Sequence, residues 1–187
     1  MTPQDETAAA VLELTFGRAP TLGGGRLVCV DGPAGSGKTT LADRLRRGSD
    51  RLDRRSTVVH MDDLYAGWSG LAQVDAQLEG LLGPMAAGEP GRYRRFDWEA
   101  GTFAETVVVP PVPVLVLEGV GSGSARFEHL RTVLVWVEAP YDVRMSRGLE
   151  RDGEAFAPHW EQWAQDEGAL FARERTRERA DLLLETG

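Results

Sequence analysis

Eight consecutive residues have the types and spacing of a phosphate-binding loop. Residues 32–39 read Gly-Pro-Ala-Gly-Ser-Gly-Lys-Thr and fit the pattern G-x-x-x-x-G-K-[ST]. Glycines at these positions let the backbone turn, so that successive N–H groups point inward at an anion. A strand is expected before this segment and a helix after it, and the N-terminus of that helix adds positive potential. The sequence therefore predicts a P-loop at residues 32–39 that holds the phosphates of ATP.

Two side chains of this loop have roles beyond the backbone. Lys38 is the only lysine among the 21 basic residues of the chain, and a flexible ammonium can reach into a tight loop where a planar guanidinium cannot. We expect Lys38 to bridge the β- and γ-phosphates and the Thr39 hydroxyl to ligate Mg²⁺. The predicted ATP-binding residues are Gly32, Ala34, Gly35, Ser36, Gly37, Lys38, Thr39, Thr40 and Arg144.

A pair of acids, Asp62 and Asp63, follows a predicted strand at residues 57–61. Ligands of open α/β sheets bind at the carboxyl ends of strands, so these acids are expected near the γ-phosphate. A carboxylate there can accept the proton of an attacking hydroxyl or hold Mg²⁺ through water. We predict that Asp62 is the catalytic base, whereas Asp63 is interpreted as a helix cap and His60 as structural.

Another acid, Glu118, ends the apolar run at residues 114–117. An apolar strand that ends in an acid is the arrangement in which a carboxylate supports Mg²⁺ beside a P-loop. The alternative is an ordinary acid at a strand end. We predict a magnesium site formed by Thr39, Asp62 and Glu118.

Three arginines are spaced so that they share one face of a helix. Arg144, Arg147 and Arg151 are three and four residues apart. Guanidinium groups side by side repel one another unless an anion lies opposite, and a transferring phosphoryl group is such an anion. The alternative is a solvated face neutralised by nearby acids. We predict that Arg147 and Arg151 are catalytic, like Lys38 and Asp62, and that Arg144 contacts ATP.

Aromatic, cationic and acidic residues gather in two short segments that suit an acceptor pocket. Rings can stack on a flat molecule, and a carboxylate can bind its hydroxyls. The alternative is a set of core aromatics with arginines lying along the surface. The predicted acceptor-binding residues are Tyr65, Trp68, Tyr93, Arg94, Phe96, Asp97 and Trp98.

Alternating strand and helix patterns place these residues on an α/β scaffold. Strands are predicted at residues 26–31, 57–61, 104–109 (an edge strand), 114–117, 132–137 and 181–185, and helices at 3–16, 38–47, 71–87, after 140 and at 159–179. This order predicts a three-layer fold, a mostly parallel five-stranded sheet with helices on both faces. We expect one P-loop kinase domain over residues 1–187: helix and linker (1–25), core (26–151), lid (152–166), and C-terminal helix and strand (167–187).

Composition narrows the classes of partner. The chain has 187 residues, a net charge of −8 and one cysteine, and no apolar run approaches a membrane span. It lacks the basic run of a nucleic-acid binder and the residue order of a signal peptide. We therefore expect a cytoplasmic protein whose partner is a small-molecule acceptor, not a nucleic acid or a membrane; a homodimer remains open.

Together these residues resemble the uridine kinase-like branch of P-loop kinases, which includes phosphoribulokinase and one type of pantothenate kinase. The shared features are the P-loop, Asp62 with Tyr65 after it, residues 96–98, residues 117–119 and the arginine-bearing helix. The resemblance implies a nucleoside-monophosphate-kinase-like fold, Mg·ATP as donor, Asp62 as base and Glu118 as a magnesium-site acid. Phe96 and Gly101 stand where uridine kinases carry the Tyr and His that recognise the base.

Three functions fit these observations. The first is an ATP-dependent kinase that transfers the γ-phosphate to a hydroxyl of a nucleoside-like or other small acceptor. The second is a regulatory ATPase or switch without such an acceptor, which would hydrolyse ATP alone. The third is a nucleoside monophosphate kinase, in which Arg94 and Arg95 would bind the acceptor phosphate.

Overall fold

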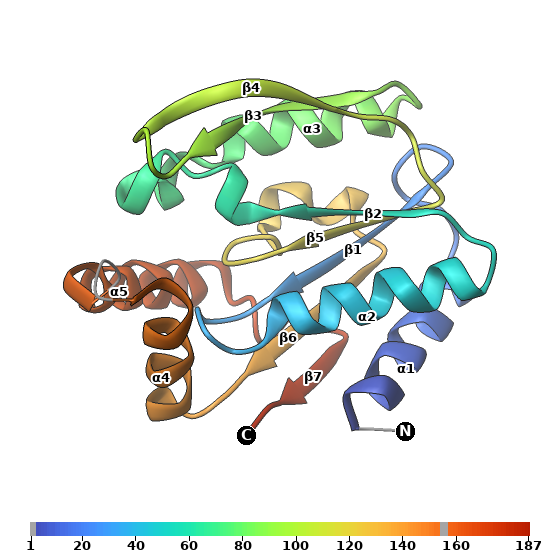
Figure 1. The fold of residues 1–187 in the computed structure, drawn as a ribbon. Helices are drawn as coiled ribbons and strands as arrows, with labels where there is room; N and C mark the ends of the chain where they lie inside the picture. The colour runs from blue at the N-terminus through green and yellow to red at the C-terminus, as the bar shows by residue number, and fades with distance from the viewer. Residues whose placement is uncertain (1–2, 154–156) are drawn as a thin grey trace.

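Five parallel strands form the centre of the computed structural model, which describes residues 3–153 and 157–187. The strands are β1 (Arg26–Asp31), β2 (Ser56–His60), β5 (Val114–Glu118), β6 (Val133–Glu138) and β7 (Leu182–Glu185). Their order is β2-β5-β1-β6-β7, and each neighbouring pair is parallel (Figure 1). The predicted α/β class and five-stranded sheet are confirmed.

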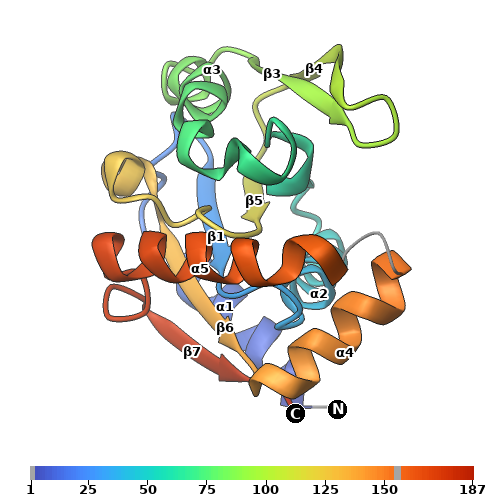
Figure 2. The same ribbon diagram turned by 90° about the vertical axis from the view of Figure 1, so that its left-hand side faces the viewer.

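Helices cover both faces of this sheet (Figure 1). The α-helices are α1 (Pro3–Gly17), α2 (Lys38–Arg51), α3 (Asp75–Ala86), α4 (Tyr141–Asp152) and α5 (Ala157–Glu174). Short 3₁₀ helices are η1 (Met61–Asp63), η2 (Gly67–Gln73) and η3 (Ala125–Leu130). In both views α5 lies across the carboxyl ends of the strands (Figures 1 and 2). In the part of the chain that the structure describes, no helix is long and apolar enough to span a membrane.

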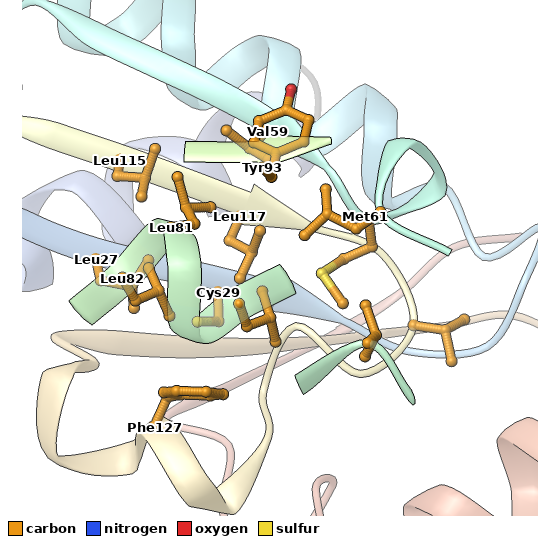
Figure 3. Packing of buried hydrophobic residues seen from close by; sticks show 14 of the residues in the cluster. Leu27, Cys29, Val59, Met61, Leu81, Leu82, Tyr93, Leu115, Leu117 and Phe127 are labelled. Atoms are coloured by element: carbon orange, nitrogen blue, oxygen red, sulfur yellow. The ribbon is translucent and has the colours of Figure 1, made fainter. Parts of the chain in front are cut away.

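The central strands are apolar because both of their faces are buried. Successive residues of β1 point to opposite sides: Val28 joins the cluster under α1 and α2 with Leu41, whereas Leu27 and Cys29 join the cluster under α3 and η3 with Phe127 (Figure 3). A strand buried on both faces needs apolar residues at every position, which explains the runs read from the sequence. These two cores hold the carboxyl ends of the strands in fixed register.

A separate hairpin lies beyond the sheet, beside α3 (Figure 1). Its strands β3 (Gly91–Asp97) and β4 (Thr102–Val109) pair antiparallel with each other. The predicted edge strand at 104–109 therefore belongs to this hairpin and not to the parallel sheet. No strand was predicted at 91–97, because its alternating charged and aromatic residues were interpreted only as pocket residues.

Element ends differ from the sequence prediction by several residues. The helix expected at 38–47 continues to Arg51, and the one expected at 159–179 ends at Glu174. The next residue, Arg175, has φ 51°, a left-handed conformation that ends a helix. The predicted helix at 71–87 begins as the 3₁₀ segment η2 and becomes α-helical at Asp75.

Candidate functional site

The order of the strands brings the three main sequence motifs to one edge of the sheet. β1 leads into the P-loop, the adjacent β5 ends in Glu118, and β2 beyond it leads into Asp62. The carboxyl ends of parallel strands share one edge, where ligands of such sheets bind. Three segments that are far apart in sequence thus end at the same edge of the sheet.

The P-loop has a backbone that only glycine adopts readily. Gly32, Gly35 and Gly37 have φ of 140°, 77° and 94°. A Cβ on Gly35 would lie 2.4 Å from the carbonyl oxygen of Arg144, so the loop also packs directly on α4. Ser36 Oγ is buried without a hydrogen-bond partner among the described residues. The loop therefore has the turn of an anion cradle and a polar group still to be satisfied.

Lys38 lies buried at the start of α2, and its ammonium donates a hydrogen bond to the Pro33 carbonyl at 2.8 Å. Burial lowers the pKa of Lys38, whereas nearby carboxylates, above all Glu118 and Glu167, oppose that shift. The charge is thus folded back inside the loop, where the sequence predicted it. Thr39 and Thr40 follow in the first turn of α2, and both are exposed.

Glu118 is the point where three elements meet. Its Oε1 accepts a hydrogen bond from Thr39 Oγ1 at 3.2 Å and lies 2.5 Å from His60 Nδ1. His60 pairs with Glu118 in the β2–β5 register, and this hydrogen bond is the main reason that the pKa of His60 is raised. His60, interpreted as structural, is therefore in contact with the predicted metal site.

The Thr39 and Glu118 oxygens suit Mg²⁺, which usually takes one or two protein oxygens together with phosphates and water. Among the described residues there is no cluster of three or more His, Cys, Asp or Glu side chains that would hold a metal by itself. An ion on the Thr39 and Glu118 oxygens would have further coordination positions for phosphate oxygens and water.

Asp62 is exposed in η1, directly after β2. The indole N–H of Trp98 donates to the Asp62 carbonyl at 3.0 Å, which ties the hairpin to this turn. The adjacent Asp63 has a different environment: its carboxylate accepts a hydrogen bond from Tyr93, and burial raises its pKa. Of the two acids, Asp62 is the more exposed.

Two of the three helix arginines contact the P-loop. Arg144 Nη1 donates to the Ala34 carbonyl at 3.2 Å, and Arg147 Nη1 lies 3.4 Å from the Gly35 carbonyl oxygen. Arg147 also donates to Thr186 Oγ1 at 3.0 Å, and Thr186 in turn donates to the Ser36 carbonyl. Arg151 lies in the last turn of α4, and its side chain is outside the described part of the chain. The predicted lid at 152–166 is likewise described only in part, because its residues 154–156 lie outside the described part of the chain.

Two buried acids that contact the P-loop were missed by the sequence analysis. Asp31 ends β1 and accepts hydrogen bonds from the backbone N–H groups of Gly32, Gly121 and Gly123 at 2.7, 3.0 and 2.8 Å. Burial raises its pKa to about 6. An acid that ends an apolar strand immediately before a P-loop was the available signal.

Glu167 is the second missed acid. It lies on α5 with 3% of its surface exposed, and it accepts hydrogen bonds from the Ala34 N–H at 2.8 Å and from Arg144 at 3.2 Å. It shares a buried helix face with Trp160 and Trp163. Its signal in the sequence was the helical spacing of three and four residues that Trp160, Trp163 and Glu167 share.

A cavity of about 500 Å³ opens between η2, the hairpin and α5. It is lined by Ala66, Gly67, Trp68, Ser69, Phe96, Trp98, Gly101, His159, Gln162, Trp163 and Asp166. The Trp68 ring packs edge-on against Trp98 at 5.1 Å and stacks on His159 at 4.9 Å. The volume is that of a pocket for a small molecule.

Three of the seven predicted acceptor residues, Trp68, Phe96 and Trp98, line this cavity. The other four do not. Tyr65 and Tyr93 are buried in the core, and the Tyr65 hydroxyl donates to the Val120 carbonyl at 2.6 Å. Arg94 donates to the Phe103 carbonyl, and Asp97 accepts the N–H groups of Glu99 and Ala100, so both are engaged within the hairpin.

No protein-family model and no curated protein matches the sequence. Solved structures match its fold. A candidate fructose transport system kinase from Silicibacter sp. TM1040 superimposes with a TM-score of 0.68 at 22% identity, covering 98% of this chain and 99% of that one. A possible uridine kinase from Bacillus stearothermophilus has a TM-score of 0.64 at 21% identity, covering 96% and 98%. The chain has the fold of these P-loop kinases.

A third match extends this fold group. D-glycerate 3-kinase from Cryptococcus neoformans has a TM-score of 0.52 at 16% identity, covering 94% of this chain and 87% of that one. These three proteins are named for different small molecules, so the shared fold does not specify the acceptor. The resemblance read from the sequence is thus confirmed at the level of the fold.

Proposed function

We propose that the chain is an ATP-dependent kinase that transfers the γ-phosphate of Mg·ATP to a hydroxyl of a small molecule. One observation carries this proposal: the cavity wall and the proposed base are joined by the hydrogen bond from Trp98 to the Asp62 backbone. A molecule in the cavity would therefore lie near the turn of Asp62. That turn follows β2, and β2 is separated from the P-loop strand β1 only by β5, which ends in Glu118. A donor site and an acceptor site that share one base are what phosphoryl transfer needs.

The chemistry follows from these positions. The acceptor oxygen bonds to the γ-phosphorus, its proton passes to Asp62, and the bond from the γ-phosphorus to the bridging oxygen breaks, which releases ADP. Lys38, Arg147 and Arg151 would stabilise the charge that spreads over the phosphoryl oxygens. Thr39 and Glu118 would hold Mg²⁺, which neutralises phosphate charge when bound.

The cavity favours an acceptor without a phosphate group. No lysine or arginine is among its described lining residues, and a phosphate would need such cations. The two arginines of the third hypothesis are engaged on the hairpin, Arg95 by Glu105 at 2.6 Å and Arg94 by the Phe103 carbonyl. We therefore prefer a nucleoside-like or other hydroxylated acceptor with a flat face to a nucleoside monophosphate.

A built cavity also favours a kinase over a regulatory ATPase, because a switch needs no acceptor pocket. Phe96 and Gly101 both line the cavity, and neither residue has a polar side-chain group for the contacts that uridine kinases make with the base. A nucleoside acceptor would therefore have to be recognised by stacking and by the polar lining residues Ser69, His159, Gln162 and Asp166.

The test offers the purified protein Mg·ATP with matched pairs of acceptors, each with and without a phosphate group. Nucleosides and nucleotides, sugars and sugar phosphates, and vitamins with their phosphates make suitable pairs, and ADP release is followed. We expect turnover with an unphosphorylated member only. Turnover that needs no acceptor would favour the regulatory ATPase, and preference for phosphorylated members would favour the monophosphate kinase.

A further inference from the structure

The buried carboxylate of Glu167 occupies groups that a P-loop normally offers to a phosphate. Its Oε2 accepts the Ala34 N–H at 2.8 Å, and its Oε1 lies 3.2 Å from Arg144 Nη1. The side chains of Arg144 and Glu167 are only 12% and 4% exposed, so solvent screens this pair little. An internal anion thus lies on the loop where an external one is expected.

This arrangement is costly unless it serves the site. Burial of a carboxylate is unfavourable, and here it raises the pKa of Glu167, while the Ala34 N–H, Lys38 and Arg144 favour the charged form. A negative charge at this position also repels the phosphates of ATP. An apolar residue at the same point of α5 would avoid both costs.

Arg144 is equipped to change partners. Its Nε is buried and has no hydrogen-bond partner among the described residues, so the guanidinium has a donor to spare. The group also lies over the rings of Tyr141 and Trp160, with 5.6 and 5.8 Å to the ring centres. A guanidinium that is stacked, desolvated and only partly hydrogen-bonded binds a further anion strongly.

We propose that the Glu167 carboxylate holds the Ala34 N–H and Arg144 in the place of a phosphate, and that ATP takes Arg144 from it. Glu167 then lowers the affinity for ATP, and its displacement couples the P-loop to α5. The same helix supplies His159, Gln162, Trp163 and Asp166 to the cavity. Nucleotide binding would therefore shift the residues that line the proposed acceptor site. The inference rests on the proposed function in taking ATP as the ligand.

The decisive variant is Glu167→Gln, which keeps an oxygen for the Ala34 N–H and removes the charge. Titration calorimetry without acceptor should show ATP bound roughly tenfold more tightly by the variant, because the repulsion is gone and Arg144 is free. The gain for ADP should be less than about threefold, because the missing phosphate removes much of the repelled charge. Glu161→Gln is the matched control, because it removes a negative charge from an exposed position of the same helix. It should leave the affinities for ATP and ADP unchanged.

The outcomes separate this inference from the proposed function. ATP binding by the wild type with equal or weaker binding by Glu167→Gln would overturn the inference alone, since a purely structural Glu167 would lose affinity for both nucleotides. An equal gain for ATP and ADP would also overturn it. No heat with ATP for either protein would overturn the proposed function and this inference together.

A measurement on the wild type removes the dependence on one variant. Trp160 lies against the Arg144 guanidinium, so departure of Arg144 should change its fluorescence. ATP should produce an emission change that Trp160→Phe abolishes, and ADP a smaller one. An ATP-saturated protein with an unchanged Trp160 signal would show that Arg144 stays with Glu167, against the proposal.

Discussion

The Lys38 ammonium is a buried charge surrounded by carboxylates. Burial lowers its pKa, and the carboxylates of Glu118, Glu167, Asp31 and Asp62 oppose that change. In the described structure its hydrogen bond goes to the Pro33 carbonyl, within the loop itself. A charge held this way is ready for phosphate oxygens and has no other evident task.

Replacement of Lys38 by alanine should therefore remove both nucleotide affinity and turnover. We expect turnover to fall by at least about a hundredfold, since a desolvated cation beside the transferring group is lost. Calorimetry with Mg·ATP and an ADP-release assay measure the two effects. Normal ATP affinity in this variant would contradict the role given to Lys38.

Asp62→Asn separates binding from chemistry. The amide keeps the size of the side chain but cannot take a proton, so ATP binding should survive while transfer falls by about 10²- to 10⁴-fold. Asp63→Asn is the matched control, because Asp63 is hydrogen-bonded to Tyr93 and is not expected to accept the proton. Equal turnover in Asp62→Asn and the wild type would exclude Asp62 from the mechanism.

Asp31→Asn tests the hydrogen bonds that join the end of β1 to the P-loop and to the segment after β5. The carboxylate satisfies three backbone N–H groups with two oxygens, whereas asparagine offers one oxygen and turns an NH₂ toward a donor. The free energy of unfolding should fall by about 1–3 kcal/mol. Urea denaturation of both proteins measures the difference, and a variant as stable as the wild type would contradict it.

The effect of pH on this difference has a definite sign. Burial raises the pKa of Asp31 from its usual 3.8 to about 6, so the folded protein binds this proton more tightly than the unfolded chain does. The resulting stabilisation is complete below the unfolded pKa and is lost as pH rises through about 6. The stability gap between wild type and Asp31→Asn should therefore be larger at pH 4.5 than at pH 7.5.

Among the elements, the hairpin and α5 form opposite walls of one cavity. Trp98 has a double position there: its ring lines the cavity, and its N–H bonds to the turn that carries Asp62. A single side chain thus links the cavity to the turn that carries the proposed base.

Two substitutions of Trp98 should divide these roles. Trp98→Phe keeps an aromatic ring but loses the N–H, so kcat should fall severalfold with little change in the acceptor KM. Trp98→Ala also removes the wall, so KM should rise by about tenfold or more. Val108→Ala, on the exposed side of the hairpin, is the control. A fall in ATP affinity in either Trp98 variant would contradict these roles, because it would show that Trp98 acts on the nucleotide site.

The sequence allowed the prediction of elements whose signals are local. The P-loop, the buried strands and the acids at the ends of β2 and β5 each carry their pattern within a few residues. The hairpin strand β3 was missed because its alternation of arginines and aromatics looked like pocket residues. The contribution of α5 was missed because Glu167 and Ala34 are 133 residues apart in sequence and come into contact only in the folded structure.

For the whole molecule, the site lies where separate layers join. The P-loop touches α4 through Gly35, α5 through Glu167, and the segment after β7 through Thr186. A ligand held there connects parts of the chain that are far apart in sequence, so binding should stabilise the fold as a unit.

Mg·ATP should accordingly raise the melting temperature. At a hundred times its dissociation constant, a ligand that binds only the folded state adds about 2.7 kcal/mol, which corresponds to roughly 5–10 °C for a chain of this size. A thermal melt with and without Mg·ATP measures the shift. Lys38→Ala should show almost none of it, and the same shift in both proteins would place the nucleotide away from the P-loop.

β3 and β4 pair with each other and, among the described residues, with no strand of the parallel sheet. The hairpin is therefore a structural unit separate from the sheet. The sheet and its two hydrophobic cores carry the P-loop, whereas the hairpin contributes Trp98, which bonds to the turn of the proposed base. Under the proposed function, changes in the hairpin would alter the choice of acceptor and leave the two hydrophobic cores of the sheet in place. Exchange of residues 91–109 is thus the natural route by which this scaffold would acquire a new specificity.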